Sequence, residues 1–375
     1  MKIGLISCWF QHQIYSDYAR KFRDNLQALG AEVKVIASEC GCGMSRKIKR
    51  GGLIEKPDIF LKTAYPVIHK EWSAPVKKLT FKLGAGYNLK RGIELNMVCR
   101  DCDVLHFQQV NDSFGAETLF AFLRFPSKAK KVVTVHELDP IQLHYRKLNK
   151  LYRKAHRVLV HSNYMKNELM ALGVEEEKLQ VVPFGVDLPE LNGQKRTRIV
   201  YYGGHHLLSG KGFQPFLKAV AQLKRAGISY PVAVHGGFSG ADTLAGMRLA
   251  KELGVNEQVE WLGKAEGRKL HRIYQEGVLS VIPFKKGTGS FAATLSMANA
   301  TPVVATQAVE LPEYLGDQAL FVPVDDAESL EKKMKVLLTQ PGLRTQMGRQ
   351  LRRRAESIFA WPVIAKKILE LYNRD

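Results

Sequence analysis

The hydrophobic pattern alternates between two kinds of segment along most of the chain. Short runs rich in β-branched residues, such as 1–6 and Val278–Ile282, have the length and composition of buried strands. Longer segments between them carry apolar residues at helical spacing, as in 15–29, which ends at Gly30. Regular alternation of strands and helices is typical of α/β domains with parallel sheets. The pattern therefore predicts an α/β fold.

The predicted elements fall into two series, separated by the polar stretch 187–197 (DLPELNGQKRT), which has the composition of a linker. The expected strands are 1–6, 31–37, 104–107, 131–135, 158–161, 179–182, 198–202, 231–235, 259–262, 278–282, 303–305 and 321–323. The expected helices are 15–29, 114–122, 141–155, 164–172 (capped by Ser162), 213–226, 242–253, 268–275, 291–299, 327–338, 343–359 and 362–372. Only 39–90 breaks the alternation. Two Rossmann-like halves with a deep cleft between them are the natural architecture, with ligands at the carboxyl ends of the strands.

The charge of the chain is strongly positive, with 56 basic against 36 acidic residues and a formal net charge of +20. Such an excess favours an acidic partner: nucleic acid, an anionic membrane surface or a phosphorylated substrate. The segment Arg46–Arg91 alone holds twelve Lys or Arg and three Asp or Glu. No helix-turn-helix, zinc-finger or RRM-type motif accompanies the charge, so we do not expect nucleic acid as the partner. The basic helix expected at 141–155 suits a phosphate or membrane surface, or is a solvated face.

Neither a bilayer-spanning run nor a signal-peptide pattern is visible in the sequence, so we expect a cytoplasmic protein. The basic segment Arg46–Arg91 leads us to expect that it is peripheral on the inner face of the cell membrane. Five cysteines, an odd number, argue against a disulfide framework. Two pairs have ligand-like spacing, Cys40 with Cys42 and Cys99 with Cys102. They would form a four-thiolate zinc site, or Cys99 and Cys102 are small buried side chains near a helix end and a strand start.

The pattern of the stretch 278–306 predicts a strand, a loop, a helix and a second strand. The loop carries groups that could bind a ligand. The turn Gly287-Thr288-Gly289-Ser290 opens a helix and follows Lys285. It offers backbone N–H groups, two hydroxyls and the positive end of a helix dipole, which together suit a phosphate. The alternative is a helix cap with a role in stability alone.

Other loops with chemically active side chains also follow predicted strands. Ser209-Gly210-Lys211-Gly212 opens a helix and again offers a cation and glycines to a diphosphate. Further candidates at strand ends are Trp9, Gln11, His12, His136, Glu137, Asp139, His205 and His206. We expect no metal at His205 and His206, because neighbouring side chains diverge and no carboxylate is near in sequence.

Taken in order, these loops and several strands resemble the GT-B glycosyltransferases of family 4 over nearly the whole chain. The matching segments are Asp103-Val104-Leu105-His106, 133–138 (VTVHEL), 158–162 (VLVHS), 182–187 (VPFGVD), Lys211-Gly212, His235-Gly236-Gly237, 259–263 (VEWLG), 301–306 (TPVVAT), Leu311-Pro312-Glu313 and the final Phe359-Ala360-Trp361 with Leu371-Tyr372. The ordered series is specific, although no single motif is.

The resemblance implies two Rossmann-like domains facing each other across a deep cleft. They would be an acceptor-side domain at 1–188, a nucleotide-sugar domain at 189–357 and a closing helix at 358–375 that crosses back. It also implies sugar transfer from a nucleotide-sugar with retention of configuration, without metal or other cofactor. Lys211 matches the lysine that holds the donor diphosphate, and His136 the histidine beside the transferred sugar. The remaining implied donor-side positions are His206, Gly212, Gly263, Lys264, Gly287, Thr288, Gly289 and Ser290, and those on the acceptor side are Trp9, Gln11 and His12.

Three departures from the family pattern stand out. Two glutamates usual in the family fall here on Gly287 and Leu295, and the usual arginine falls on His206. The glycine pair expected after the first strand is replaced by Trp9–Gln13. We therefore expect a retaining glycosyltransferase with altered donor recognition, acting on a glycan or lipid-linked acceptor in cell-surface polysaccharide synthesis. The alternatives are a catalytically silent binding protein on the same fold and a nucleotide-sugar 2-epimerase.

Overall fold

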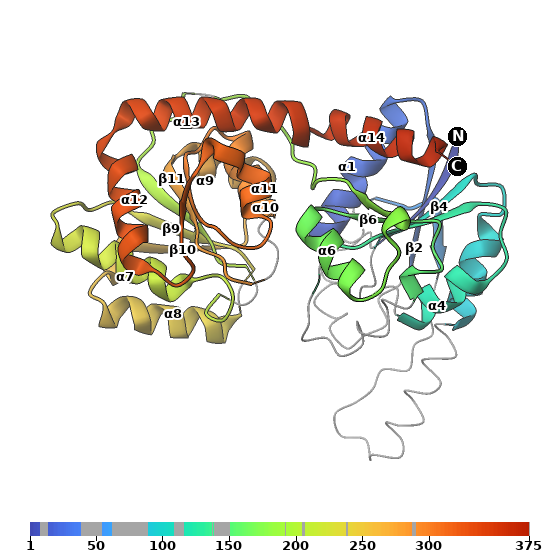
Figure 1. Cartoon of the computed structure of the whole chain (residues 1–375), viewed down its shortest axis with the longest axis horizontal. Helices are drawn as coiled ribbons and strands as arrows, with labels where there is room; N and C mark the ends of the chain where they lie inside the picture. Colours follow the sequence, from blue (N-terminus) through green and yellow to red (C-terminus); the bar gives the residue numbers. More distant parts are fainter. Residues whose placement is uncertain are drawn as a thin grey trace, which may run out of the picture. The chain divides into compact units, whose positions relative to one another are not determined.

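The computed structural model describes residues 1–7, 14–38, 55–61, 89–108, 116–136, 138, 151–191, 193–204, 207–237, 239–286 and 290–374. They form two compact units, unit 1 (Met1–Pro183 with Trp361–Asp375) and unit 2 (Phe184–Ala360). Each unit has one parallel sheet with helices packed on it, which confirms the predicted α/β class (Figure 1).

Unit 1 contains a sheet of seven strands in the order β3-β2-β1-β4-β5-β6-β7, and each neighbouring pair is parallel. The order reverses between β1 and β4, so the loops after these strands diverge and leave room for a ligand at the carboxyl edge. The strands are β1 (Lys2–Ile6), β2 (Glu32–Ser38), β3 (Ile59–Leu61), β4 (Val104–Gln108), β5 (Lys130–Thr134), β6 (Arg157–Val160) and β7 (Leu179–Val181).

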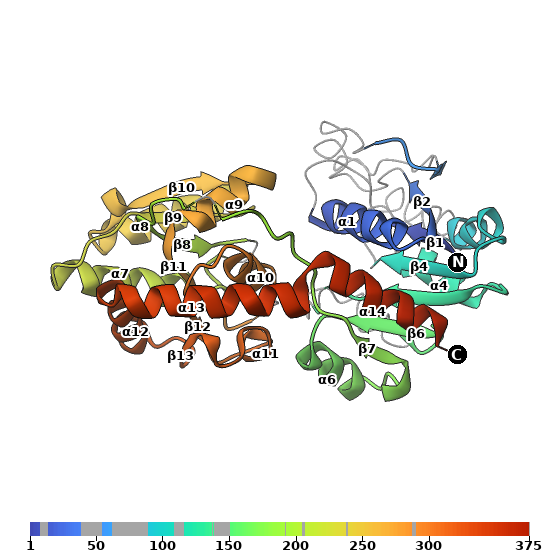
Figure 2. The same cartoon turned by 90° about the horizontal axis from the view of Figure 1, so that it is seen from above.

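The helices of unit 1 bury an apolar core against this sheet. Leu105, Phe107, Phe122 and Val133 are fully buried in it. The last helix of the chain, α14, runs beside the first, α1 (Figure 2). The helices are α1 (Ile14–Ala28), a helix at 89–98, α4 (Ala116–Arg124), α6 (Asn163–Ala171) and α14 (Trp361–Asn373).

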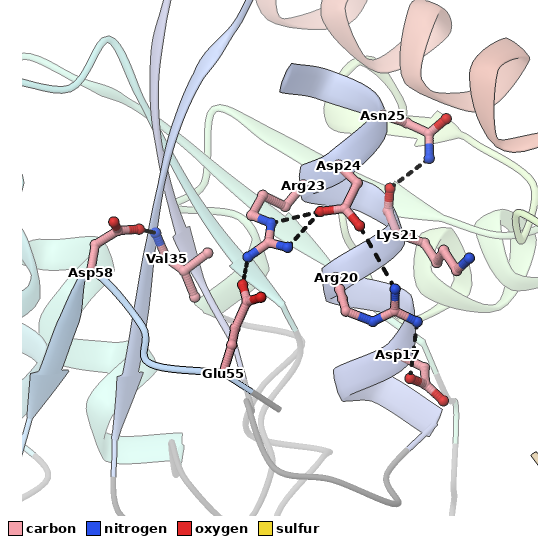
Figure 3. A network of polar contacts seen from close by, with 9 residues as sticks. All are labelled: Asp17, Arg20, Lys21, Arg23, Asp24, Asn25, Val35, Glu55 and Asp58. Atoms are coloured by element: carbon pink, nitrogen blue, oxygen red, sulfur yellow. Dashed lines mark hydrogen bonds and ion pairs between the residues drawn. The ribbon is translucent and has the colours of Figure 1, made fainter. Parts of the chain in front are cut away.

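A polar network ties the short strand β3 to the rest of unit 1 (Figure 3). The Arg23 guanidinium on α1 donates to Asp24 Oδ1 at 2.6 and 2.8 Å and pairs with Glu55. Asp58 Oδ2 accepts the backbone N–H of Val35 at 2.6 Å. These bonds fix the segment that leads into β3 against α1 and β2.

Unit 2 contains a sheet of six parallel strands in the order β10-β9-β8-β11-β12-β13. This is the doubly wound order, with its switch point between β8 and β11. The strands are β8 (Arg198–Tyr202), β9 (Val232–His235), β10 (Val259–Gly263), β11 (Gly277–Ile282), β12 (Val303–Thr306) and β13 (Leu320–Val322). The helices are α7 (Phe213–Arg225), α8 (Gly240–Glu252), α9 (Gly267–Gln275), α10 (Ser290–Ala298), α11 (Leu311–Leu315), α12 (Ala327–Thr339) and α13 (Pro341–Arg354).

The structure differs from the predicted elements in a few places. The expected helix 343–359 ends at Arg354 and continues as a five-residue π-helical segment, Ala355–Phe359. β3 and α11 were not predicted, because three and five residues are too few to show a period. Most of the expected helix 141–155 lies outside the described residues. None of the helices in the described part of the chain is long and apolar enough to cross a bilayer.

Candidate functional site

Three adjacent strands of unit 1 present polar side chains where they end. Gln108 closes β4, His136 lies two residues after β5, and His161 directly follows β6. Side chains alternate between the faces of a strand, so Gln108 shares a face with His106 and His136 shares one with Thr134. The ladders pair Gln108 with Thr134 and Thr134 with Leu159, which brings the three strand ends level.

Hydrogen bonds join these side chains into a row. His136 Nε2 is 2.7 Å from Gln108 Oε1, and His136 Nδ1 is 2.8 Å from His161 Nε2. The row ends at the backbone, where His161 Nδ1 donates to the Val182 carbonyl oxygen at 2.9 Å. The imidazole of His136 is therefore held at both nitrogens.

A second branch of the network leads from Gln108 to α14. Gln108 Nε2 lies 3.4 Å from His106 Nε2, which also bonds Thr134 Oγ1 at 2.7 Å. The other ring nitrogen, His106 Nδ1, bonds the hydroxyl of Tyr372. The histidine row is thus continuous with the C-terminal helix.

Aromatic rings cover the row and exclude water from it. The Tyr18 ring on α1 lies 4.7 Å from that of His136 and 5.7 Å from that of His161, centroid to centroid. Burial lowers the pKa of His106 to about 3 and that of His161 to about 4. Burial, and then the neighbouring His161 and His106, hold the pKa of His136 well below its usual value. Burial therefore disfavours a positive charge on any of these imidazoles.

In unit 2 the loop before α7 packs directly on the segment after β11. Gly212 has φ of +66°, and a Cβ there would overlap the carbonyl oxygen of Pro283. The Gly210 carbonyl oxygen accepts the backbone N–H groups of Lys285 at 3.0 Å and Lys286 at 3.2 Å. The two loops therefore form one rigid surface at the switch point between β8 and β11, where ligands bind in doubly wound sheets.

Lys211 belongs to this surface and is mostly buried. Its ammonium lies 3.9 Å from the centroid of the Phe284 ring, and its carbonyl oxygen accepts the Tyr201 hydroxyl at 2.7 Å. In the chain Lys211 lies two residues before the first residue of α7. A cation and a helix N-terminus at one point suit the charge of a diphosphate.

The helix expected after the Gly-Thr-Gly-Ser turn forms as α10 and begins at Ser290. The Ser290 N–H donates to Glu310 Oε1 at 2.9 Å, and Glu310 is buried. This N–H is thus already used by a carboxylate. Gly287, Thr288 and Gly289 lie outside the described residues.

Gly263 and Lys264 lie at the end of β10. The Gly263 carbonyl oxygen accepts the N–H of Gly236 at 2.9 Å, and Lys264 Nζ pairs with Glu266 Oε1 at 2.6 Å. β10 is the edge strand, two strands from β8. Gly263 and Lys264 therefore lie two strands away from β8, the strand that leads to the loop of Lys211.

Several candidates fall outside the described residues: Trp9, Gln11, His12, Glu137, Asp139, His205, His206, Cys40 and Cys42. Cys99 and Cys102 are described, and both are buried free thiols. A hydrogen bond between the two thiols raises the pKa of Cys99 and lowers that of Cys102. Among the described residues no three metal-binding side chains gather. The zinc hypothesis therefore stays untested.

Sequence reasoning assigned no role to Gln108, His161 or Glu310. Gln108 and His161 could have been found from their position at strand ends. Gln108 lies two residues after His106, just as His136 lies two residues after Thr134. No sequence signal indicates Glu310, because its partner Ser290 is twenty residues away.

Two protein-family models match adjoining parts of the chain. Residues 16–190 match "Glycosyltransferase Family 4", and residues 189–354 match "Glycosyl transferases group 1". Together the two models cover residues 16–354 of the chain.

One curated relative is the MMP α-(1→4)-mannosyltransferase of Mycolicibacterium hassiacum. It is 28% identical over 213 residues, which cover 55% of this chain and 51% of the relative. The chain thus spans about half the length of the curated relatives that it matches.

Solved structures with the same fold match nearly the whole chain. A glycosyltransferase from Rickettsia africae has a TM-score of 0.74 at 16% identity, covering 99% of this chain and 97% of that one. The HepE protein of Anabaena, solved with UDP and glucose, has a TM-score of 0.70 at 14% identity and covers 99% of both chains. At these identities the likeness shows the fold alone.

Proposed function

The chain belongs to the group 1, family 4 glycosyltransferases, and on that premise we propose that it transfers a sugar from a nucleotide-sugar donor with retention of configuration. The acceptor is a glycan or a lipid-linked sugar in cell-surface polysaccharide synthesis. No metal or other cofactor takes part.

The observation that carries the proposal is the position of Lys211. A departing nucleoside diphosphate must be stabilised by positive charge in a metal-free transfer. Lys211 supplies a cation in the loop that leads into α7, and Gly212 allows that helix to start against Pro283. Charge and helix dipole then act on the same phosphate.

UDP is the nucleotide that the comparisons support, since HepE of Anabaena was solved with UDP and glucose. The mannosyltransferase relative supports a hexose as the transferred group. His136 serves on the acceptor side of the reaction, next to the sugar being transferred.

A donor screen tests the proposal in two steps. The purified full chain is first heated with UDP-, GDP- and ADP-sugars, and a binder raises the melting temperature by mass action. The stabilising donor is then incubated with the protein and a lipid-linked acceptor fraction. We expect release of the nucleotide and a product with the donor's anomeric configuration.

The same assay separates the alternatives. A silent binding protein shows stabilisation by a donor but no nucleotide release with any acceptor fraction. A 2-epimerase converts the donor when no acceptor is present. If no nucleotide-sugar stabilises the fold or turns over, the proposal is wrong.

We also propose that the protein works at an anionic membrane surface. The basic segment Arg46–Arg91 that first suggested this lies mostly outside the described residues, but the helix at 89–98 adds a structural argument. Leu89, Ile93 and Met97 are spaced by four residues and all are exposed, Met97 to 60%. Lys90 and Glu94 are the charged neighbours of this stripe, with 3.7 Å between Nζ and Oε1. An exposed apolar stripe on one helix face is typical of helices that lie in the membrane interface.

The surroundings of the stripe fit an anionic bilayer. The opposite face of the helix packs tightly on α4, where Asn96 Nδ2 donates to the Phe122 carbonyl oxygen at 3.1 Å. Phe120 of α4 is also exposed and has the Arg124 guanidinium 4.8 Å from its ring centroid. Each Lys or Arg near such a surface contributes about 1 kcal/mol to binding.

Vesicle sedimentation tests the membrane proposal. The chain should bind vesicles with phosphatidylglycerol and not those of phosphatidylcholine alone. Ile93→Gln with Met97→Gln should abolish binding, while Leu244→Gln with Met247→Gln, at exposed positions of α8, should leave it unchanged. Binding that survives the first pair of substitutions, or is absent in the parent protein, would overturn it.

A further inference from the structure

The hydrogen-bond row in unit 1 restricts where protons can lie. The Val182 carbonyl oxygen only accepts, so His161 Nδ1 carries a proton. A single proton lies between His161 Nε2 and His136 Nδ1, which are 2.8 Å apart. Whether His136 Nε2 carries a proton depends on the group that faces it.

That group is the Gln108 carboxamide, which has two orientations with nearly the same shape. With Oε1 toward the ring at 2.7 Å, His136 Nε2 must donate. The two imidazoles then share three protons and one positive charge. With the amide nitrogen toward the ring, Nε2 accepts, and the two imidazoles hold two protons and are neutral.

We propose that Gln108 and His161 are positioning residues for His136. His161, fixed by the Val182 carbonyl oxygen, keeps a proton on His136 Nδ1. In the orientation that the structure has, Nε2 donates to Gln108 Oε1, and after the carboxamide turns over Nε2 accepts from its amide nitrogen. The inference rests on the proposed function, in which His136 lies beside the transferred sugar.

The orientation of the Gln108 carboxamide also affects the groups around the His136–His161 pair. In the described part of the chain, the titratable groups that face the row or its branch include Tyr18 from α1, His106 from β4 and Tyr372 from α14. When Gln108 turns its oxygen toward His136, its amide nitrogen faces His106 Nε2. His106 then carries its proton on Nδ1 and donates to the Tyr372 hydroxyl. The proton count on His136 is thus coupled to the tautomer of His106.

Imidazole nitrogen shifts of the ¹⁵N-labelled full chain test the inference without any donor. The His136 signals are assigned by their loss in His136→Gln. Because burial disfavours the charge, at pH 7.5 we expect His136 and His161 to be neutral, each with its proton on Nδ1, and the Gln108 carboxamide to be turned over so that its amide nitrogen faces His136 Nε2. A neutral His136 with its proton on Nε2 would overturn the inference in the unaltered protein.

Two matched substitutions extend the test. In Gln108→Glu the carboxylate only accepts, so Nε2 must donate, and the titration of His136 should rise by about 1 to 3 pH units. Gln108→Met keeps the side-chain volume but makes no hydrogen bond, so it should raise the titration of His136 far less. A folded Gln108→Glu protein with an unchanged His136 titration would contradict the inference, whereas failure to find a sugar donor would contradict only the proposed function.

Discussion

Glu310 accepts a hydrogen bond from the backbone N–H of Ser290, with 2.9 Å between the amide nitrogen and Oε1. The bond places a buried carboxylate at the positive end of α10, where the sequence predicted a phosphate. A negative charge at this point stabilises the helix dipole. It also repels a second anion that approaches the same turn.

The first prediction concerns this carboxylate. Glu310→Gln keeps an acceptor for Ser290 but removes the charge, so affinity for UDP should rise by about two- to five-fold, in line with the strength of charge–dipole interactions. Calorimetric titration measures the change, with Glu313→Gln on α11 as the control. A tenfold loss of affinity would instead show that the carboxylate itself contacts the ligand.

The second prediction concerns Lys211. Lys211→Ala should weaken UDP binding by about ten- to a hundred-fold, because one charge-assisted hydrogen bond contributes about 1.5–3 kcal/mol. Lys285→Ala is the matched control, since Lys285 follows β11 in the same surface but pairs with Asp325 at 3.0 Å. Equal affinity of the Lys211 variant and the parent protein would remove Lys211 from the site.

The third prediction separates two effects of glycine. Gly212 and Gly227 both have positive φ, +66° and +78°, but only at Gly212 would a Cβ meet other atoms. Gly227→Ala should therefore lower the free energy of unfolding by about 1 kcal/mol from backbone strain alone. Gly212→Ala should lower it by at least about 2 kcal/mol more, because the clash with Pro283 forces the loops apart. Thermal unfolding of the two variants compares them, and similar losses would show that the loops can separate freely.

The fourth prediction concerns acid. The folded-state pKa values of His106 and His161, about 3 and about 4, lie below the ordinary value of 6.5. The unfolded chain therefore binds more protons between these values, and the stability of unit 1 is complete above about pH 6.5 and falls as the pH drops toward 4. Each histidine contributes a slope of up to about 1.4 kcal/mol per pH unit.

Hydrogen exchange of the β4 and β5 amides measures this slope locally. His106→Gln should make the slope of the opening free energy against pH shallower. Near pH 8 the opening free energy of the variant should differ from that of the parent protein by an amount that does not depend on pH. A slope that is identical in the variant and the parent protein would show that His106 is not neutral in the folded state.

Much of the fold follows from local chemistry and was predictable. The Ser162 side chain accepts the N–H of Met165 as the expected cap of α6, and Gly212 allows the predicted turn before α7. The predicted family and the predicted α/β class are confirmed. Both could be predicted because strand ends and turns are formed by residues that are contiguous in the sequence. The roles assigned to Lys211 and His136 remain predictions.

The residues at strand ends and helix starts can be identified from the amino-acid sequence, because these positions depend on neighbours a few residues apart. Which of these ends meet depends on how the folded elements pack. Gln108, His136 and His161 form one row because β4, β5 and β6 pair in register, and Glu310 reaches Ser290 because α10 and α11 pack together. Such pairings arise from the burial of whole elements, a long-range effect that no local pattern of residues encodes.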